Sequence, residues 1–166
     1  MAYSASYPIP RNMLNTIEGC AGGLGGVGIF GGLAGPGADL VVIAPVWAGM
    51  VVTLAVQAGK NMDKETAKKL TIAVATGVGS FALGTKVGAT VLGWLLAIPS
   101  AGLSLAASAA ANAALNAKFT HAYGKAVALY FLQTDSIDSI DVMTQVLISL
   151  VAIQFGFSPD GTNVTA

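Results

Sequence analysis

Residues 40–59 read LVVIAPVWAGMVVTLAVQAG and carry no charged side chain over 20 positions. An α-helix rises about 1.5 Å per residue, so a helix of this length matches a bilayer hydrocarbon core of roughly 30 Å. The pattern recurs elsewhere, and further charge-free runs occupy residues 19–38, 70–85, 87–117 and 142–159. These runs predict an all-α fold that is embedded in a membrane.

The overall composition agrees with an apolar environment. Hydrophobic residues make up 54% of the 166 residues and charged residues 10%, whereas soluble domains carry about 25% charged residues. Eight basic residues balance eight acidic ones. Because a nucleic-acid-binding domain needs a one-sided basic excess, we expect no nucleic-acid partner.

Tight turns and longer polar loops alternate between the charge-free runs. The turns read GPGAD at residues 35–39 and IPSAG at residues 98–102, and the second polar loop covers residues 133–141. Asp138 in that loop is the predicted N-cap of the last helix. The predicted divisions of this single helical domain are a first hairpin over 12–59, a polar loop over 60–69, a second hairpin over 70–131 and a C-terminal helix over 139–157.

The basic residues collect at one end of these hairpins. Both tight turns fall at the opposite end. Seven of the eight basic residues lie away from them: Arg11, Lys60, Lys64, Lys68, Lys69, Lys118 and Lys125. The positive-inside rule therefore predicts a membrane location with the basic loops in the cytoplasm. A soluble four-helix bundle is the alternative, although it should show polar residues on the outer face of each helix.

A glycine-rich stretch precedes the first tight turn. Gly23-x-Gly25-x-x-Gly28 has the spacing of a dinucleotide-binding loop, but no strand pattern precedes it and the next acid, Asp39, follows Pro36. On a helix, small residues four apart instead let two backbones approach closely in lipid. The predicted helix-packing glycines are Gly19, Gly22, Gly23, Gly26, Gly28, Gly31, Gly32 and Gly35, together with Gly84 and Gly88 in the third segment.

A stripe of polar residues follows the second tight turn. Its members recur every four residues, so each adjoins the next on a helix. They are Ser104, Ser108, Asn112, Asn116 and Thr120. Buried amides need hydrogen-bond partners in an apolar environment. The stripe therefore joins neighbouring helices or lines a wetted pathway, and the lack of an acidic residue in this segment favours the first role.

Catalytic and metal-binding patterns are missing from the sequence. Cys20 and His121 are the single cysteine and histidine, so a Cys/His metal cage is excluded. The sequence shows no paired carboxylates and no nucleophile with its base. We therefore expect no enzymatic activity, no cofactor and no metal.

Two long stretches resemble a known family. Residues 36–70 read PGADLVVIAPVWAGMVVTLAVQAGKNMDKETAKKL, and residues 98–131 read IPSAGLSLAASAAANAALNAKFTHAYGKAVALYF. Over residues 36–131 the chain resembles the uncharacterised helical domain found C-terminal to some Era-like GTPase domains and in YcjF-type bacterial membrane proteins. The matching residues are Ala38, Asp39, Ile98, Pro99, Gly102, Thr120, Ala122, Gly124, Lys125, Ala126, Tyr130 and Phe131. The resemblance implies a membrane-associated helical module and, as one possibility, a GTPase partner. GTP binding is not carried over from the family, because the chain lacks a GTPase domain.

These observations together predict a non-enzymatic, membrane-associated helical protein. We expect it to bind the lipid bilayer and to self-associate as a structural, scaffolding or membrane-shaping homo-oligomer. Two alternatives stay open at this point. One is a channel or pore lined by the Ser/Asn stripe, and the other is a soluble self-assembling helical module whose apolar faces are buried between subunits.

Overall fold

The computed structural model describes residues 3–31, 38–84 and 105–154, and the side-chain surroundings of residues 3–23, 43–78 and 116–154. Every regular element in these ranges is an α-helix, which confirms the all-α prediction. The helices are α1 (Arg11–Gly31), α2 (Ala38–Gln57), α3 (Lys64–Gly84), α5 (Leu105–Gln133) and α6 (Ile140–Gln154). Among the helices in these ranges, none combines the length and the apolar character that crossing a bilayer requires.

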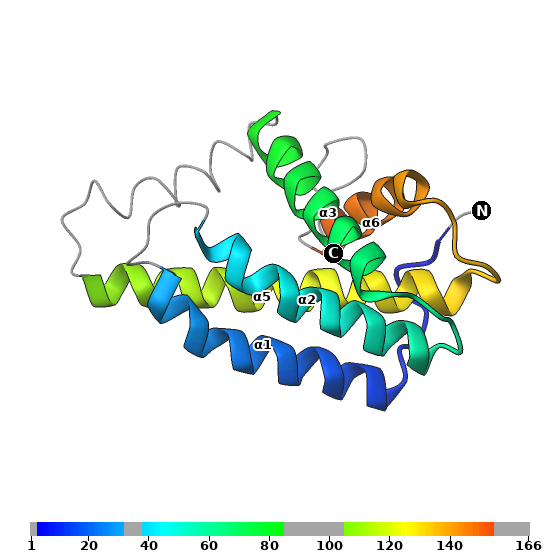
Figure 1. Ribbon diagram of the computed structural model, residues 1–166, viewed down its shortest axis with the longest axis horizontal. Helices are drawn as coiled ribbons and strands as arrows, with labels where there is room; N and C mark the ends of the chain where they lie inside the picture. The colour runs from blue at the N-terminus through cyan, green and yellow to red at the C-terminus, as the bar shows by residue number, and fades with distance from the viewer. Residues whose placement is uncertain (1–2, 32–37, 85–104, 155–166) are drawn as a thin grey trace.

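α5 is the central helix of the bundle (Figure 1). α1 packs along α5 and α2, both α2 and α6 contact α5, and α3 contacts α2 and α6. In Figure 1, α1 runs antiparallel to α2 and to α5. The start of α1, the turn between α2 and α3 and the end of α5 therefore lie at the same end of the molecule.

α5 is most deeply buried near its end. Residues 126–131 are all buried, and Tyr123, Tyr130 and Phe131 are among the largest fully buried side chains. A helix that is apolar or small all round gains most by lying in the interior, where no face has to meet water. This composition explains why α5 occupies the centre.

α1 buries a single stripe of side chains. Met13, Ile17 and Ala21 recur every four residues and face the core, because such residues share one side of a helix. Pro10 precedes the helix, and its carbonyl accepts hydrogen bonds from the backbone N–H groups of Met13 and Leu14. The opposite side of α1 is left without a neighbour within residues 11–23.

The turn between α2 and α3 depends on Gly59, whose φ of 71° lies in the left-handed region. The backbone N–H of Gly59 donates to the carbonyl of Val56, and that of Lys60 donates to Ala55 at 2.8 Å. This pair of bonds is a Schellman motif, which satisfies the last carbonyls of a helix and favours glycine at the left-handed position. Gly59 therefore ends α2 sharply and starts the turn.

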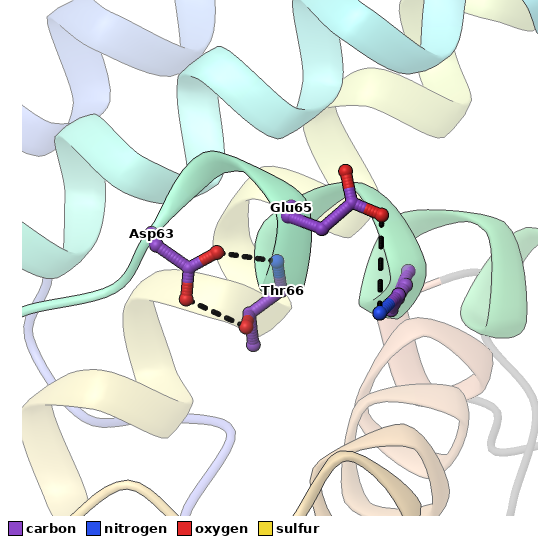
Figure 2. A network of polar contacts seen from close by, with 4 residues as sticks. Asp63, Glu65 and Thr66 are labelled. Atoms are coloured by element: carbon purple, nitrogen blue, oxygen red, sulfur yellow. Dashed lines mark hydrogen bonds and ion pairs between the residues drawn. The ribbon is translucent and has the colours of Figure 1, made fainter.

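Asp63 caps the start of α3, as Figure 2 shows. One carboxylate oxygen accepts the backbone N–H of Thr66 at 2.9 Å, and the other accepts the Thr66 hydroxyl at 2.7 Å. An acid that accepts the third N–H of a helix is a strong N-cap. These bonds, led by that from the hydroxyl, lower the pKa of Asp63 below its ordinary value of 3.8. α3 consequently begins at Lys64, inside residues 60–69, which the sequence analysis assigns to a polar loop.

α6 begins one residue later than predicted because Ser139, and not Asp138, is its N-cap. The Ser139 hydroxyl accepts the backbone N–H of Val142 at 3.5 Å, and its carbonyl accepts that of Met143. Asp138 instead accepts a hydrogen bond from the phenol of Tyr130 at 2.8 Å. Burial raises the pKa of this phenol to about 12, so it remains a donor. The predicted cap at Asp138 is therefore wrong, and the predicted helix end at residue 157 lies outside the described residues.

An N-terminal strap, residues 3–9, packs over the end of α5. The Gln133 side chain holds the backbone of Ser4 on both sides: its Oε1 accepts the Ser4 N–H at 2.7 Å, and its amide donates to the Ser4 carbonyl at 3.0 Å. Tyr3 stacks on Tyr130, with ring centroids 5.5 Å apart. The strap thus covers the core at the end of the molecule where α1 begins.

Candidate functional site

The charged side chains that the structure describes gather toward one end of the helix bundle. They belong to residues 11–18, 60–69 and 118–141. The start of α1, the α2–α3 turn and the start of α6 lie at this end, on the right in Figure 1; we call it the charged end. The opposite end, which contains the end of α1, the start of α2, the end of α3 and the start of α5, is called the uncharged end because no charged side chain is described there; within the described helices it carries one charged residue, Asp39 at the start of α2.

The face of α2 that points away from the core carries no charge over residues 43–57. Its exposed side chains are Pro45, Val46, Thr53 and Val56, and 38% of Val46 and 61% of Val56 are exposed. In a water-facing helix, charged and polar residues occupy this side. α2 therefore presents an apolar surface to its surroundings.

One face of α3 changes character along its length. Lys64, Lys68 and Ile72 recur every four residues, so they lie on one side of the helix. All three side chains are exposed, including 41% of Ile72. The same face therefore passes from two ammonium groups to an aliphatic side chain, in the direction of the uncharged end.

Two other lysines of the charged end have partners within the chain. Lys69 pairs with Glu65 one turn earlier at 3.8 Å (Figure 2), an exposed helical pair that contributes only about 0.3–0.5 kcal/mol. The ammonium of Lys60 donates to the backbone carbonyl of Asp135 at 2.8 Å. This second contact joins the α2–α3 turn to the loop between α5 and α6.

Thr120, the last member of the polar stripe, joins two helices. Trp47 on α2 donates its indole N–H to the Thr120 hydroxyl at 2.8 Å, and that hydroxyl donates to the carbonyl of Asn116 at 2.6 Å. Thr120 is fully buried. The side-chain nitrogen of Asn116 is buried and has no hydrogen-bond partner among the described residues. The contacts of Thr120 are those that a helix-joining role requires.

Tyr123 links α5 to α3 beside that contact. Its phenol lies 3.0 Å from the hydroxyl of Thr71, which donates its own hydrogen to the carbonyl of Ala67. The phenol is therefore the donor to Thr71. Trp47 and Phe119 pack against the Tyr123 ring, and burial raises the pKa of the phenol. The phenol stays protonated at neutral pH, and its hydrogen bond to Thr71 joins α5 to α3.

Three of the glycines predicted for helix packing face open space among the described residues. A Cβ atom placed on Gly19, Gly22 or Gly23 would have no neighbouring atom within 4 Å. These positions form part of the side of α1 that lacks a neighbour. The prediction that they bring helices together consequently concerns contact with another molecule, and it stays a prediction.

Among the glycines whose surroundings the structure describes, close approaches occur at two that sequence reasoning did not select for packing. On α5, a Cβ at Gly124 would lie 2.8 Å from Cγ1 of Ile17 and 3.2 Å from the sulfur of Met50. On α3, a Cβ at Gly77 would meet the side chain of Ile148. An isolated glycine inside a helical pattern is the signal that could have found Gly124, since glycine lowers helix stability unless packing requires it; Gly77 stands two residues before Gly79 and gives no such signal.

The remaining residues predicted for helix packing or for the polar stripe lie where the structure does not describe the side-chain surroundings. Gly32, Gly35, Gly88 and Ser104 lie outside the described residues. Other positions lie in α1, α3 or α5, but their side-chain surroundings are not described. These are Gly26, Gly28, Gly31, Gly84, Ser108 and Asn112.

The described residues also bear on metal binding and on the reactivity of the single cysteine. In the ranges that the structure covers, no three His, Cys, Asp or Glu side chains come close enough to share a metal ion. Cys20 is partly buried and packs against the core. Burial raises the pKa of its thiol, which keeps the sulfur protonated and weakly nucleophilic.

No protein-family model, curated protein or solved structure matches the chain. The likeness to the helical domain of Era-like GTPases and YcjF-type proteins, with its implied GTPase partner, stays an expectation. What the protein does is therefore inferred from the distribution of charge, apolar surface and open helix faces.

Proposed function

We propose that the protein is a non-enzymatic, membrane-associated scaffold that inserts the uncharged end of its helix bundle into the bilayer. The observation that carries this proposal is that the described charged side chains gather toward one end of the bundle. Charged side chains are costly in hydrocarbon, whereas apolar surface gains free energy by leaving water. A bundle divided in this way has one favoured orientation at a lipid surface, with its charged end in water.

The apolar face of α2 supports the same orientation. Val46 and its exposed neighbours face outward without a charged residue among them. Burying a valine side chain fully contributes roughly 1.5 kcal/mol relative to leaving it in water. In this arrangement the basic residues of the charged end face the cytoplasm, as the positive-inside rule expects.

Self-association is the second part of the proposal. The open side of α1 at Gly19, Gly22 and Gly23 offers a second copy a backbone without side chains, which favours close helix packing in lipid. The buried bond between Trp47 and Thr120 supports a helix-joining role for the polar stripe over a wetted path. We therefore favour a scaffold over a pore.

Membrane association is tested by flotation of the purified protein with vesicles of neutral phosphatidylcholine. Val46→Glu places a charge on the α2 face, and we expect it to reduce vesicle binding about tenfold or more, because a central carboxylate costs about 2.5 kcal/mol or more on insertion scales. The matched control is Val142→Glu, since Val142 is 47% exposed but lies at the charged end, on α6. It should bind as the original protein does.

Two results would contradict this part of the proposal. The first is a failure of the original protein to float with the vesicles, and the second is an equal loss of binding in Val46→Glu and Val142→Glu. Far-ultraviolet circular dichroism of both variants shows whether either one has lost its helices. Because both sites are exposed, we expect unchanged helix content.

Self-association is tested by light scattering in mild detergent. Gly22→Leu combined with Gly23→Leu should reduce the oligomer size, because two large side chains hold a second helix away. Gly49→Leu on α2 is the control, since an added side chain also meets open space there. An unchanged size distribution in the α1 variant would remove this face from the assembly.

A further inference from the structure

The start of α3 carries two lysines, Lys64 and Lys68, whose ammonium groups have no partner among the described residues. Residues 60–69 contain four lysines and two acids. Lys60 and Lys69 have partners, the Asp135 carbonyl and Glu65. Of the described residues, none accepts a hydrogen bond or forms an ion pair with Lys64 or Lys68.

The two acids nearby are already engaged. Asp63 accepts two hydrogen bonds from Thr66 in the helix cap, and Glu65 faces Lys69 on the neighbouring side of the helix. Neither acid forms an ion pair with Lys64 or Lys68, and residues 60–69 keep a net charge of +2 from four lysines and two acids. An anionic group that approaches this face meets attraction from both lysines.

The next residue on the same face, Ile72, bears on how deeply α3 would enter a membrane. Ile72 lies one turn beyond Lys68, about 6 Å further along the helix axis, and it is exposed. Lysine side chains reach toward headgroups while their aliphatic stems cover apolar surface. The change from lysine to isoleucine along this face therefore fits a helix whose start lies among headgroups, with Ile72 on the acyl side.

We infer that Lys64 and Lys68 bind the anionic headgroups of phospholipids, with Ile72 placed at the top of the acyl region. This inference rests on the proposed membrane association and names its lipid partner. Each basic residue near an anionic surface contributes about 1 kcal/mol, which corresponds to about a fivefold increase in binding. α3 then determines both the lipid preference of the protein and the depth to which the uncharged end enters.

The test compares flotation with neutral phosphatidylcholine vesicles and with vesicles that also contain phosphatidylglycerol. The original protein should bind the anionic vesicles more strongly. Lys68→Gln should reduce that excess about fivefold, and Lys64→Gln with Lys68→Gln should reduce it roughly 25-fold. Lys69→Gln is the matched control, because it removes the same charge from the adjacent position, where Glu65 already pairs with it; it should change binding less than twofold.

The outcomes separate this inference from the proposed function. Equal binding of the original protein to neutral and anionic vesicles would overturn the lipid preference while leaving membrane association intact. An equal loss in Lys68→Gln and Lys69→Gln would overturn the assignment to this face. No binding to any vesicle would instead overturn the proposed function itself. At 1 M salt the anionic excess should disappear, because the Debye length falls to about 3 Å.

Discussion

α1 and the second half of α5 are both rich in small residues, yet they pack differently. On α5, Gly124 lies against Ile17 and Met50, which are both buried. On α1, a Cβ at Gly22 or Gly23 would meet no atom of the described residues. The comparison teaches that small residues show where a backbone can be approached, whereas the neighbouring helices decide whether it is approached.

The largest effect is expected at Gly124, where α5 packs closely against α1. Gly124→Ala should lower the free energy of unfolding by about 2–3 kcal/mol, as overpacked cores do. The added Cβ would lie within 2.9 Å of both γ-carbons of Ile17, and Ile17 is 1% exposed, so it has no room to move away. Urea unfolding of the purified variant measures the change. A loss below that of an ordinary surface substitution would show that α1 and α5 can separate freely.

A second prediction concerns the contact between α5 and α2. Thr120→Val should lower the free energy of unfolding by about 1–2 kcal/mol, because it leaves the buried N–H of Trp47 without an acceptor. Thr53→Val is the control, since Thr53 is exposed on α2 and bonds only to the carbonyl of Gly49. Chemical unfolding of both variants checks the difference. Equal values would indicate that Thr120 does not join the helices.

At Gly23, on the open side of α1, the free energy of unfolding should change in the opposite direction. Gly23→Ala should raise the free energy of unfolding by up to about 0.8 kcal/mol, because alanine has the higher helix propensity and the new methyl group meets no neighbour. The measurement is urea unfolding at low protein concentration, where self-association is minimal. A lower stability would reveal a contact on this face within the chain.

The smallest effect is expected at the charged end. Hydrogen bonds from Thr66 lower the pKa of Asp63 below 3.8, so its carboxylate stabilises the folded state above that pH. This contribution is lost as the pH falls through the lowered value. Asp63→Asn should therefore show a shallower fall of Tm below about pH 4 than the original protein. Glu65→Gln, which removes a charge without removing the cap, should keep the original slope; an unchanged slope in Asp63→Asn would contradict the assignment.

Some features were readable from the sequence because they are local. Helical character follows from the long apolar runs with few breakers, and the structure confirms the all-α class. The division into a charged and an uncharged end follows from where the charges stand along each helix. The start of α6 is not fixed by the sequence, because Asp138 and Ser139 are both good N-cap residues. The hydrogen bond that Asp138 accepts from Tyr130 leaves Ser139 as the cap.

The contacts that build the site depend on residues far apart in the chain. Ser4 and Gln133, which hold the N-terminal strap, are 129 positions apart, and Trp47 and Thr120 are 73 apart. No periodicity in either segment predicts such pairs, because they depend on which helix faces meet when the bundle packs.

The sequence by itself determined the helical class, the charge-free runs and the position of the basic residues, since these are properties of single segments. The tertiary structure alone decided that α5 is central, that Gly124 and Gly77 are the close approaches, and that Gly22 and Gly23 stay open. The physical reason is that a small residue removes a steric barrier without supplying an attraction. Which helix then moves close depends on the apolar area that the whole bundle can bury.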